Sequence, residues 1–86
     1  MIAVLVRIAS LDGSRVYEEA EWQRKVRQLA EKDSRVNHIR IRAGPHGVSA
    51  IAFVAAQEHS IAYLVLRRLM EQGIADDPRL RLWRVI

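Results

Sequence analysis

The most constraining feature of this chain is a short turn, Gly44-Pro45-His46-Gly47, with apolar segments on both sides. Proline presets the backbone angle of the first central turn position, and the glycines accept angles that other residues resist. Before the turn, residues 38–43 alternate between polar and apolar side chains, which is typical of a half-buried strand. After it, residues 48–56 are apolar except for Ser49, as expected of a strand inside a sheet. The stretch therefore predicts a β-hairpin against which the other elements must pack.

The remaining elements follow from hydrophobic periodicity. Strands are predicted over residues 2–9 and 80–86, and helices over 15–32 and 57–72, where apolar side chains recur at helical spacing. The order is strand, helix, strand, strand, helix, strand. Two βαβ halves with right-handed crossovers favour a ferredoxin-like βαββαβ plait. Its four-stranded antiparallel sheet would have the order 4-1-3-2, with both helices on one face.

Two residues mark the expected helix ends. Ser14 is a suitable N-cap for the first helix, because its hydroxyl can accept a hydrogen bond from a free backbone N–H. Gly73 suits the position just after the second helix, where the backbone commonly turns left-handed. No resemblance to a family is evident beyond the architecture, and this architecture hosts many functions.

Length and composition set outer limits. A chain of 86 residues, half of them hydrophobic, is expected to form one ordered domain over residues 1–86. The absence of cysteine rules out disulfides and thiolate metal sites and fits a reducing compartment, so a cytoplasmic location is expected. Residues 1–10 lack the basic start of a signal peptide, and Arg7 interrupts their apolar run. No stretch is long and apolar enough to predict a membrane span.

The sheet face without helices is the predicted interaction surface. If the bulky side chains Ile51 and Phe53 point toward the helices, the other face follows by parity. Its predicted apolar residues are Leu5, Ala50, Ala52, Val54 and Trp83. Its predicted basic residues, which could contact an anion or nucleic acid, are Arg7, Arg40, Arg42 and Arg81, with His38 beside them. A contiguous apolar patch rimmed by charge is typical of an interaction site.

Three classes of function are compatible with such a face. The first is a non-catalytic interaction or regulatory module that forms a homodimer through the open face or binds another protein. The second is a basic nucleic-acid-binding domain, since the net charge is +4 and the pI about 10.3. RNA-binding plaits stack bases on aromatic side chains of the two central strands, and the predicted parity turns Phe53 away. The third is a ligand-binding or enzymatic dimeric α+β barrel, with His38, Arg7 and Trp83 in its pocket.

No motif for catalysis, a metal or a cofactor is present. His38, His46 and His59 fall on a strand, a turn and a helix start, without the short spacing of metal ligands. The glycine-containing turn precedes a strand rather than a helix and has no lysine, so it does not predict a phosphate-binding loop. We therefore expect a protein without catalytic residues, metal or cofactor, and we expect it to be a homodimer.

Overall fold

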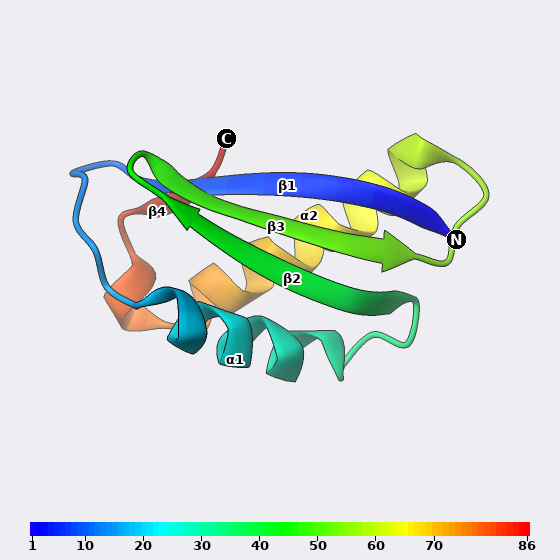
Figure 1. The fold of residues 1–86 in the computed structure, drawn as a ribbon, viewed down its shortest axis with the longest axis horizontal. Helices are drawn as coiled ribbons and strands as arrows, with labels where there is room; N and C mark the ends of the chain where they lie inside the picture. Colours follow the sequence, from blue (N-terminus) through cyan, green and yellow to red (C-terminus); the bar gives the residue numbers. More distant parts are fainter.

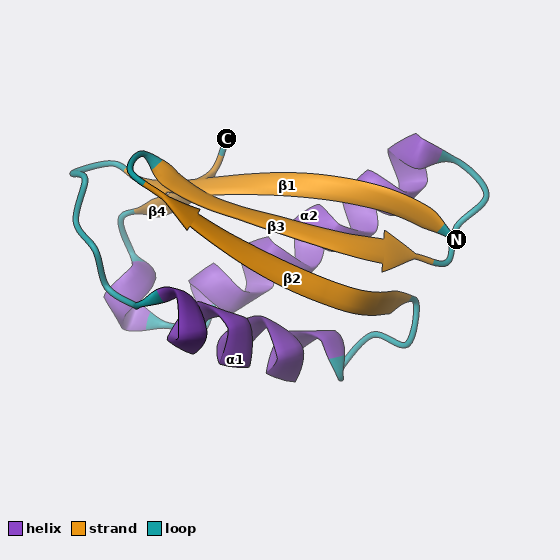
Figure 2. Cartoon of the chain, in the orientation of Figure 1, coloured by secondary structure: helices purple, strands orange, loops and turns teal.

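The structure, a computed structural model, describes residues 1–86. Its elements are β1 (Ile2–Ser10), α1 (Glu19–Ala30), β2 (Val36–Gly44), β3 (Gly47–Val54), α2 (His59–Ala75), the 3-10 helix η1 (Pro78–Leu80) and β4 (Trp83–Val85). The four strands form one antiparallel sheet in the order β2-β3-β1-β4, and α1 and α2 cover the same face (Figures 1 and 2). The predicted ferredoxin-like βαββαβ plait is confirmed.

The backbone at Gly47, where the turn ends and β3 begins, lies very close to β1. A Cβ atom added to Gly47 would lie 2.6 Å from the carbonyl oxygen of Ile8, a separation that folded proteins do not tolerate. Glycine is therefore required at this position for packing. Gly44 and Gly47 are the last pair of the β2–β3 ladder before the turn. From there β3 runs through the sheet between β1 and β2.

The orientation of β3 is opposite to the predicted one. Ala52 pairs with Val4 of β1, and these side chains are buried beneath the helices. Ile51 and Phe53 point to the uncovered face and are 39% and 45% exposed. The prediction assumed that the bulkier side of a strand faces the helices. The polar residue of the strand is the better guide to its exposed face, because Ser49 points to the same side as Ile51 and Phe53.

The small side chains of β3 face the helices because the helices supply the bulk of the core. Ala50 and Ala52 are completely buried, and so are Val26 of α1 and Leu66 of α2. Small residues on a central strand let a helix backbone approach the sheet closely, while large helix side chains fill the space. Together these elements form one continuous hydrophobic core.

Both helices differ from the predicted bounds, most at the start of the first and at the end of the second. The first begins at Glu19 rather than Arg15, and the carboxylate of Glu21 accepts a hydrogen bond from the N–H of Glu18 at 3.3 Å. Ser14 is therefore not the N-cap. The second helix continues through Gly73 to Ala75, and Gly73 is buried against the side chain of Leu29 of α1. This glycine provides a close helix crossing rather than a helix end. Neither helix has the length and apolar character needed to cross a bilayer.

The end of the chain forms a shorter strand than predicted. The segment Pro78–Leu80 forms η1, whose Leu80 is fully buried, and β4 covers only Trp83–Val85. Trp83 lies under the helices, 5.1 Å from Trp22 between ring centroids in an edge-on arrangement. Such aromatic pairs add to the stabilisation that burial provides.

The reversed orientation of β3 predicts which side chains stabilise the fold. Leu66→Ala removes a fully buried side chain and should lower the free energy of unfolding by roughly 2–5 kcal/mol. Phe53→Ala should lower it by less than about half as much, because Phe53 is 45% exposed. Urea denaturation of both variants measures the difference. An equal or greater loss for Phe53→Ala would place Phe53 in the core.

Candidate functional site on the open sheet face

Only one of the predicted apolar interface residues lies on the open sheet face. Leu5 of β1 is there, 45% exposed. Ala50, Ala52 and Val54 of β3 are buried beneath the helices, and so is Trp83 of β4. The prediction placed these four on the wrong face, because the parity of β3 and the register of β4 were misassigned.

Three other side chains form the apolar centre of the open face, hereafter the apolar strip: Leu5, Ile51 and Phe53. Leu5 lies directly opposite Ile51 in the β1–β3 ladder, and Ala3 lies opposite Phe53. Side chains opposite one another on one face of an antiparallel pair are about 5 Å apart, so the strip is contiguous. It crosses the two central strands, and no other element of the chain covers it (Figure 2).

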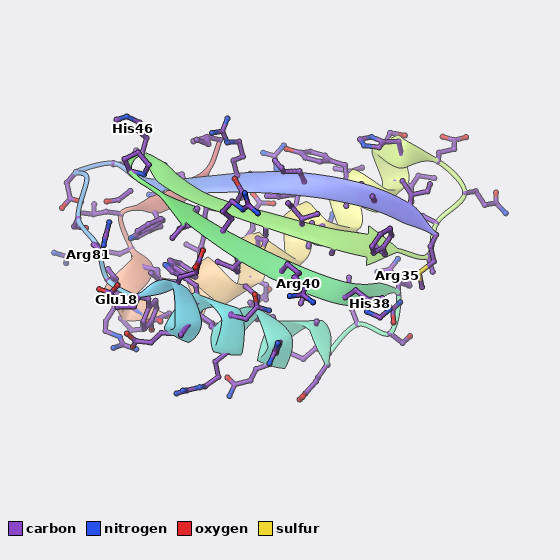
Figure 3. All side chains as sticks on the ribbon, in the orientation of Figure 1. Glu18, Arg35, His38, Arg40, His46 and Arg81 are labelled. Carbon is purple, nitrogen blue, oxygen red and sulfur yellow. The ribbon has the colours of Figure 1, made fainter.

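Arginines surround the apolar strip. Arg40 is paired with Ile51, and both Arg42 and Arg7 are paired with Ser49, so all three arginines share the open face and are exposed. Figure 3 shows Arg40 on β2 beside His38. None of these three arginines forms an ion pair in the structure.

Arg81 does not belong to this surface. It lies in the turn before β4 and lines a hollow with Glu71 and Ala75 of α2. Arg84 pairs with Ala9 and so has the parity of the open face, but it lines the same hollow as Arg81. The Arg84 guanidinium donates hydrogen bonds to the carbonyl oxygens of Arg81 and Trp83, at 2.8 and 2.6 Å.

The charge of the molecule is segregated. Of its fourteen basic and ten acidic side chains, four arginines and no acidic residue lie in the strands. The ten other basic side chains are matched by the ten acidic ones, all in helices, loops and turns. The four arginines of the strands thus equal the formal net charge of +4, and three of them, Arg7, Arg40 and Arg42, are exposed on the open sheet face. A face of one sign next to a neutral body attracts anionic partners.

A distortion of β2 places His38 at one end of the apolar strip. The β2–β3 register shifts between Asn37 and Arg40, and His38 has a φ angle of 51°. This left-handed backbone is uncommon for residues other than glycine, although asparagine, aspartate and histidine adopt it more often than the rest. A bulge of this kind changes the direction of a side chain, and the His38 ring meets Phe53 edge-on at 6.2 Å between centroids. His38 and Phe53 thus form a paired ring surface.

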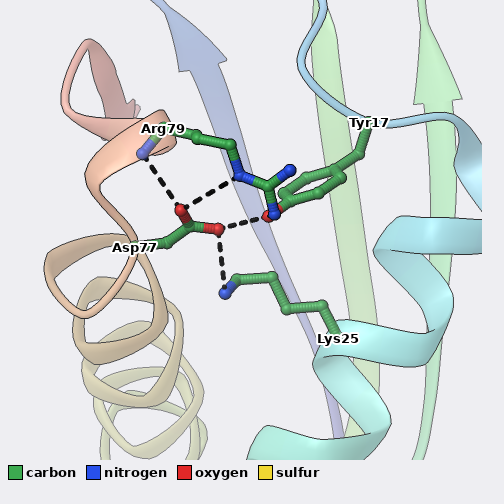
Figure 4. A network of polar contacts seen from close by, with 4 residues as sticks. All are labelled: Tyr17, Lys25, Asp77 and Arg79. Carbon is green, nitrogen blue, oxygen red and sulfur yellow. Dashed lines mark hydrogen bonds and ion pairs between the residues drawn. The ribbon is translucent and has the colours of Figure 1, made fainter.

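A second polar cluster, at the helix side of the molecule, has a structural role. Asp77, just before η1, accepts hydrogen bonds from the Tyr17 hydroxyl, from Lys25 at 3.4 Å and from the Arg79 N–H at 3.0 Å (Figure 4). These contacts, hereafter the Asp77 clasp, join the segment before β4 to α1 and the loop that precedes it. Chiefly through the Tyr17 hydrogen bond, they lower the pKa of Asp77 to about 2.

The Asp77 clasp makes stability depend on acidic pH. The pKa of Asp77 is about 2 in the folded chain, against 3.8 as the ordinary value, so its ionised form stabilises the fold above about pH 4. This contribution is lost as the pH falls to about 2. Asp77→Asn should lower the free energy of unfolding at neutral pH by on the order of 1–2 kcal/mol. Its difference from the wild type should shrink steadily between about pH 4 and pH 2.

The matched control is Asp76→Asn, which removes the same charge from the adjacent residue. Asp76 accepts a hydrogen bond only from Gln72, at 2.9 Å, and is exposed. Urea denaturation across this pH range compares the two variants. Equal losses for Asp76→Asn and Asp77→Asn would show that net charge, and not the clasp, is responsible.

The hollow at the turn end of the sheet offers no arrangement for nucleophilic catalysis. It encloses about 260 Å³ and is lined by Ser10, Ser14, Arg15 and His46, among others. The Ser10 hydroxyl donates to Asp12 at 2.5 Å and lies 3.2 Å from the Ser14 hydroxyl. The hydrogen bond from Ser10 lowers the pKa of Asp12 to about 2, so this carboxylate is a weak base. These hydrogen bonds among Ser10, Asp12 and Ser14 hold the loop that follows β1.

The three histidines remain apart from one another and from acidic clusters. His38 lies in the β2 bulge, His46 in the hairpin turn and His59 at the first position of α2. No three histidine, aspartate or glutamate side chains come together in a way that could hold a metal ion. The open face is therefore the surface whose chemistry is most distinctive.

Comparisons with protein-family models, with curated proteins and with solved structures found no match to this chain. Its function has to be inferred from its own residues.

Proposed function

We propose that this protein is a non-catalytic module that binds single-stranded nucleic acid on its open sheet face. The observation that carries the proposal is the segregation of charge, since three arginines without ion-pair partners lie on this face and no acidic side chain is in the sheet. A polyanion is the partner that such a face favours.

The apolar strip supplies the second element of single-strand recognition. Proteins of this kind combine a basic track for the phosphates with flat apolar or aromatic side chains on which bases stack. Phe53 and Ile51 lie on central strand β3, with Leu5 beside them on β1. A duplex would keep its bases inside its own stack, so these exposed side chains favour an unpaired strand.

The arginines are placed to follow one strand past the rings. Arg40 and Arg42 occupy alternate positions of β2, so their Cα atoms are roughly 7 Å apart along the strand. Arg7 of β1 and Arg42 of β2 both lie opposite Ser49, on the two sides of β3. Phosphates could contact Arg7, Arg40 and Arg42 while a base stacks on Phe53.

Self-association through the open face, the first expectation from the sequence, is disfavoured by the same charges. A two-fold contact buries the same patch on both copies, so Arg7, Arg40 and Arg42 of each copy would meet with no acidic side chain of the sheet between them. The apolar strip could still meet an acidic protein. Competition by polyglutamate, described below, distinguishes that partner from nucleic acid.

Removal of charge from the open face should weaken binding and its dependence on salt. Each phosphate contact to a single strand adds about −0.7 to the slope of log affinity against log salt. Arg40→Gln combined with Arg42→Gln should therefore reduce the magnitude of the slope by roughly 1.4. Fluorescence anisotropy with labelled single-stranded RNA and DNA measures affinity at several salt concentrations. The control is Arg24→Gln combined with Arg27→Gln on α1, which changes net charge equally but should leave the slope unchanged.

Loss of the aromatic ring should weaken binding without altering the salt slope. Phe53→Ala should reduce affinity roughly 5- to 100-fold, because base stacking contributes about 1–3 kcal/mol. Leu64→Ala on α2 is the matched control, since Leu64 is 44% exposed and Phe53 is 45% exposed. A wild type that binds neither RNA nor DNA at low salt would contradict the proposal. Equal competition by polyglutamate would favour an acidic protein instead.

A further inference from the structure

The two edges of β1 differ in how fully they are paired. On one side β3 accompanies β1 from Ile2 to Ile8. On the other side β4 pairs only with Ile8, Ala9 and Ser10. Residues 2–6 therefore form an edge of the sheet with no neighbouring strand, beyond the short β4 (Figure 1).

The backbone groups that point out of this edge are those of odd-numbered residues. The N–H of Ile86 donates to the carbonyl oxygen of Arg7 at 2.9 Å, and the N–H of Leu11 donates to Leu82 at 2.8 Å. Outward and inward groups alternate along an antiparallel strand. The N–H and C=O groups of Ala3 and Leu5 therefore point away from β3, and no strand or side chain of the protein is hydrogen-bonded to them.

The opposite edge of the sheet is capped. Gln23 of α1 donates to the carbonyl oxygen of Ile39 at 2.9 Å and accepts from the N–H of Ile41 at 2.8 Å. Glu19 of α1 accepts from the N–H of Ala43 at 2.8 Å. Side chains of α1 thus occupy outward groups of β2, which prevents another strand from pairing there.

The β1 edge has no comparable protection. The segment Ile2–Val6, with the sequence IAVLV, contains no charge and no proline, and its pairing with β3 has no bulge. Proteins usually protect an exposed edge with a charged side chain, a proline or a bulge. An apolar edge without them is a template for pairing with another strand. Its side chains, three of them β-branched, favour an extended conformation.

We propose that this edge pairs with the same edge of a second copy, in an antiparallel arrangement about a two-fold axis. The available hydrogen-bonding groups select the register. Ala3 of each copy lies opposite Leu5 of the other, and Val4 lies opposite Val4 at the axis. The two Ala3–Leu5 pairs exchange four backbone hydrogen bonds. The result is a continuous eight-stranded sheet with the helices of both copies on one face.

Charge favours a second copy as the occupant of this edge. The paired segments carry no charged side chain, so like charges do not oppose each other across the axis. Arg7 is the one charged residue of β1 and lies just beyond the paired segment, where its carbonyl accepts from Ile86. Arg40 and Arg42 lie on β2, two strands from the contact and therefore roughly 10 Å away. Leu5 would lie beside Ala3 of the second copy, which extends the apolar strip across the axis.

Two kinds of variant test this register by light scattering and sedimentation. Ala3→Pro removes only an N–H that points out of the edge, so the monomer can keep its β1–β3 hydrogen bonds. It should raise the dimer dissociation constant at least about tenfold. Ala3→Lys with Leu5→Lys opposes like charges in the proposed register and should do the same. Ala3→Glu with Leu5→Lys opposes unlike charges in that register and should retain the dimer.

The outcomes separate clearly. A wild type with a mass near 20 kDa, twice the 9.9 kDa of one chain, together with loss of the dimer only in the first two variants, supports the proposal. A wild type that stays at 9.9 kDa at high concentration overturns it. So does a dimer that survives Ala3→Lys with Leu5→Lys. If Ala3→Pro does not fold by circular dichroism, the two charged pairs decide between dimer and monomer.

Discussion

The ladder between β1 and β3 determines the arrangement of every other part of this molecule. Its register sets Val4 opposite Ala52 and Leu5 opposite Ile51. The first pair belongs to the core and the second to the open face, because successive residues of a strand point to opposite sides. A shift of one residue would bury Ile51 and Phe53 and expose the alanines. The helix packing and the character of the open face therefore depend on the same hydrogen bonds.

The sequence was sufficient to predict the order and type of the elements, because strand and helix periodicities differ clearly along the chain. It was sufficient to predict the faces of β1 and β2, where large apolar and charged residues alternate. It was insufficient for β3, whose segment is apolar on both sides. There the helices decide the orientation, since Trp22, Leu66 and their neighbours fill the core and leave room only for small side chains.

The candidate site was predictable in its charge but not in its apolar centre. Arg7, Arg40 and Arg42 follow from simple alternation, and the structure places all three on the open face. Arg81 and Trp83 were misplaced because η1 shortens the last strand. The bulge at His38 has a signal in the sequence, because Asn37 and His38 interrupt the alternation between the buried Val36 and Ile39, but the backbone angle of 51° does not follow from that signal. The long-range contact of Asp77 with Lys25 of α1 has no local signal in the sequence.

The proposed binding to nucleic acid requires positive charge on the open face, whereas the proposed pairing of two copies requires a β1 edge without charge. The two surfaces lie in different parts of the sheet. A face that exposes Leu5, Ile51 and Phe53 risks nonspecific association, and its unpaired arginines oppose contact between identical faces. The edge of β1 has no charge in residues 2–6 and can approach its own copy. Edge pairing would place two basic faces side by side on one sheet surface. A single strand long enough to reach both would then bind more tightly than to either face alone, because the second contact becomes intramolecular.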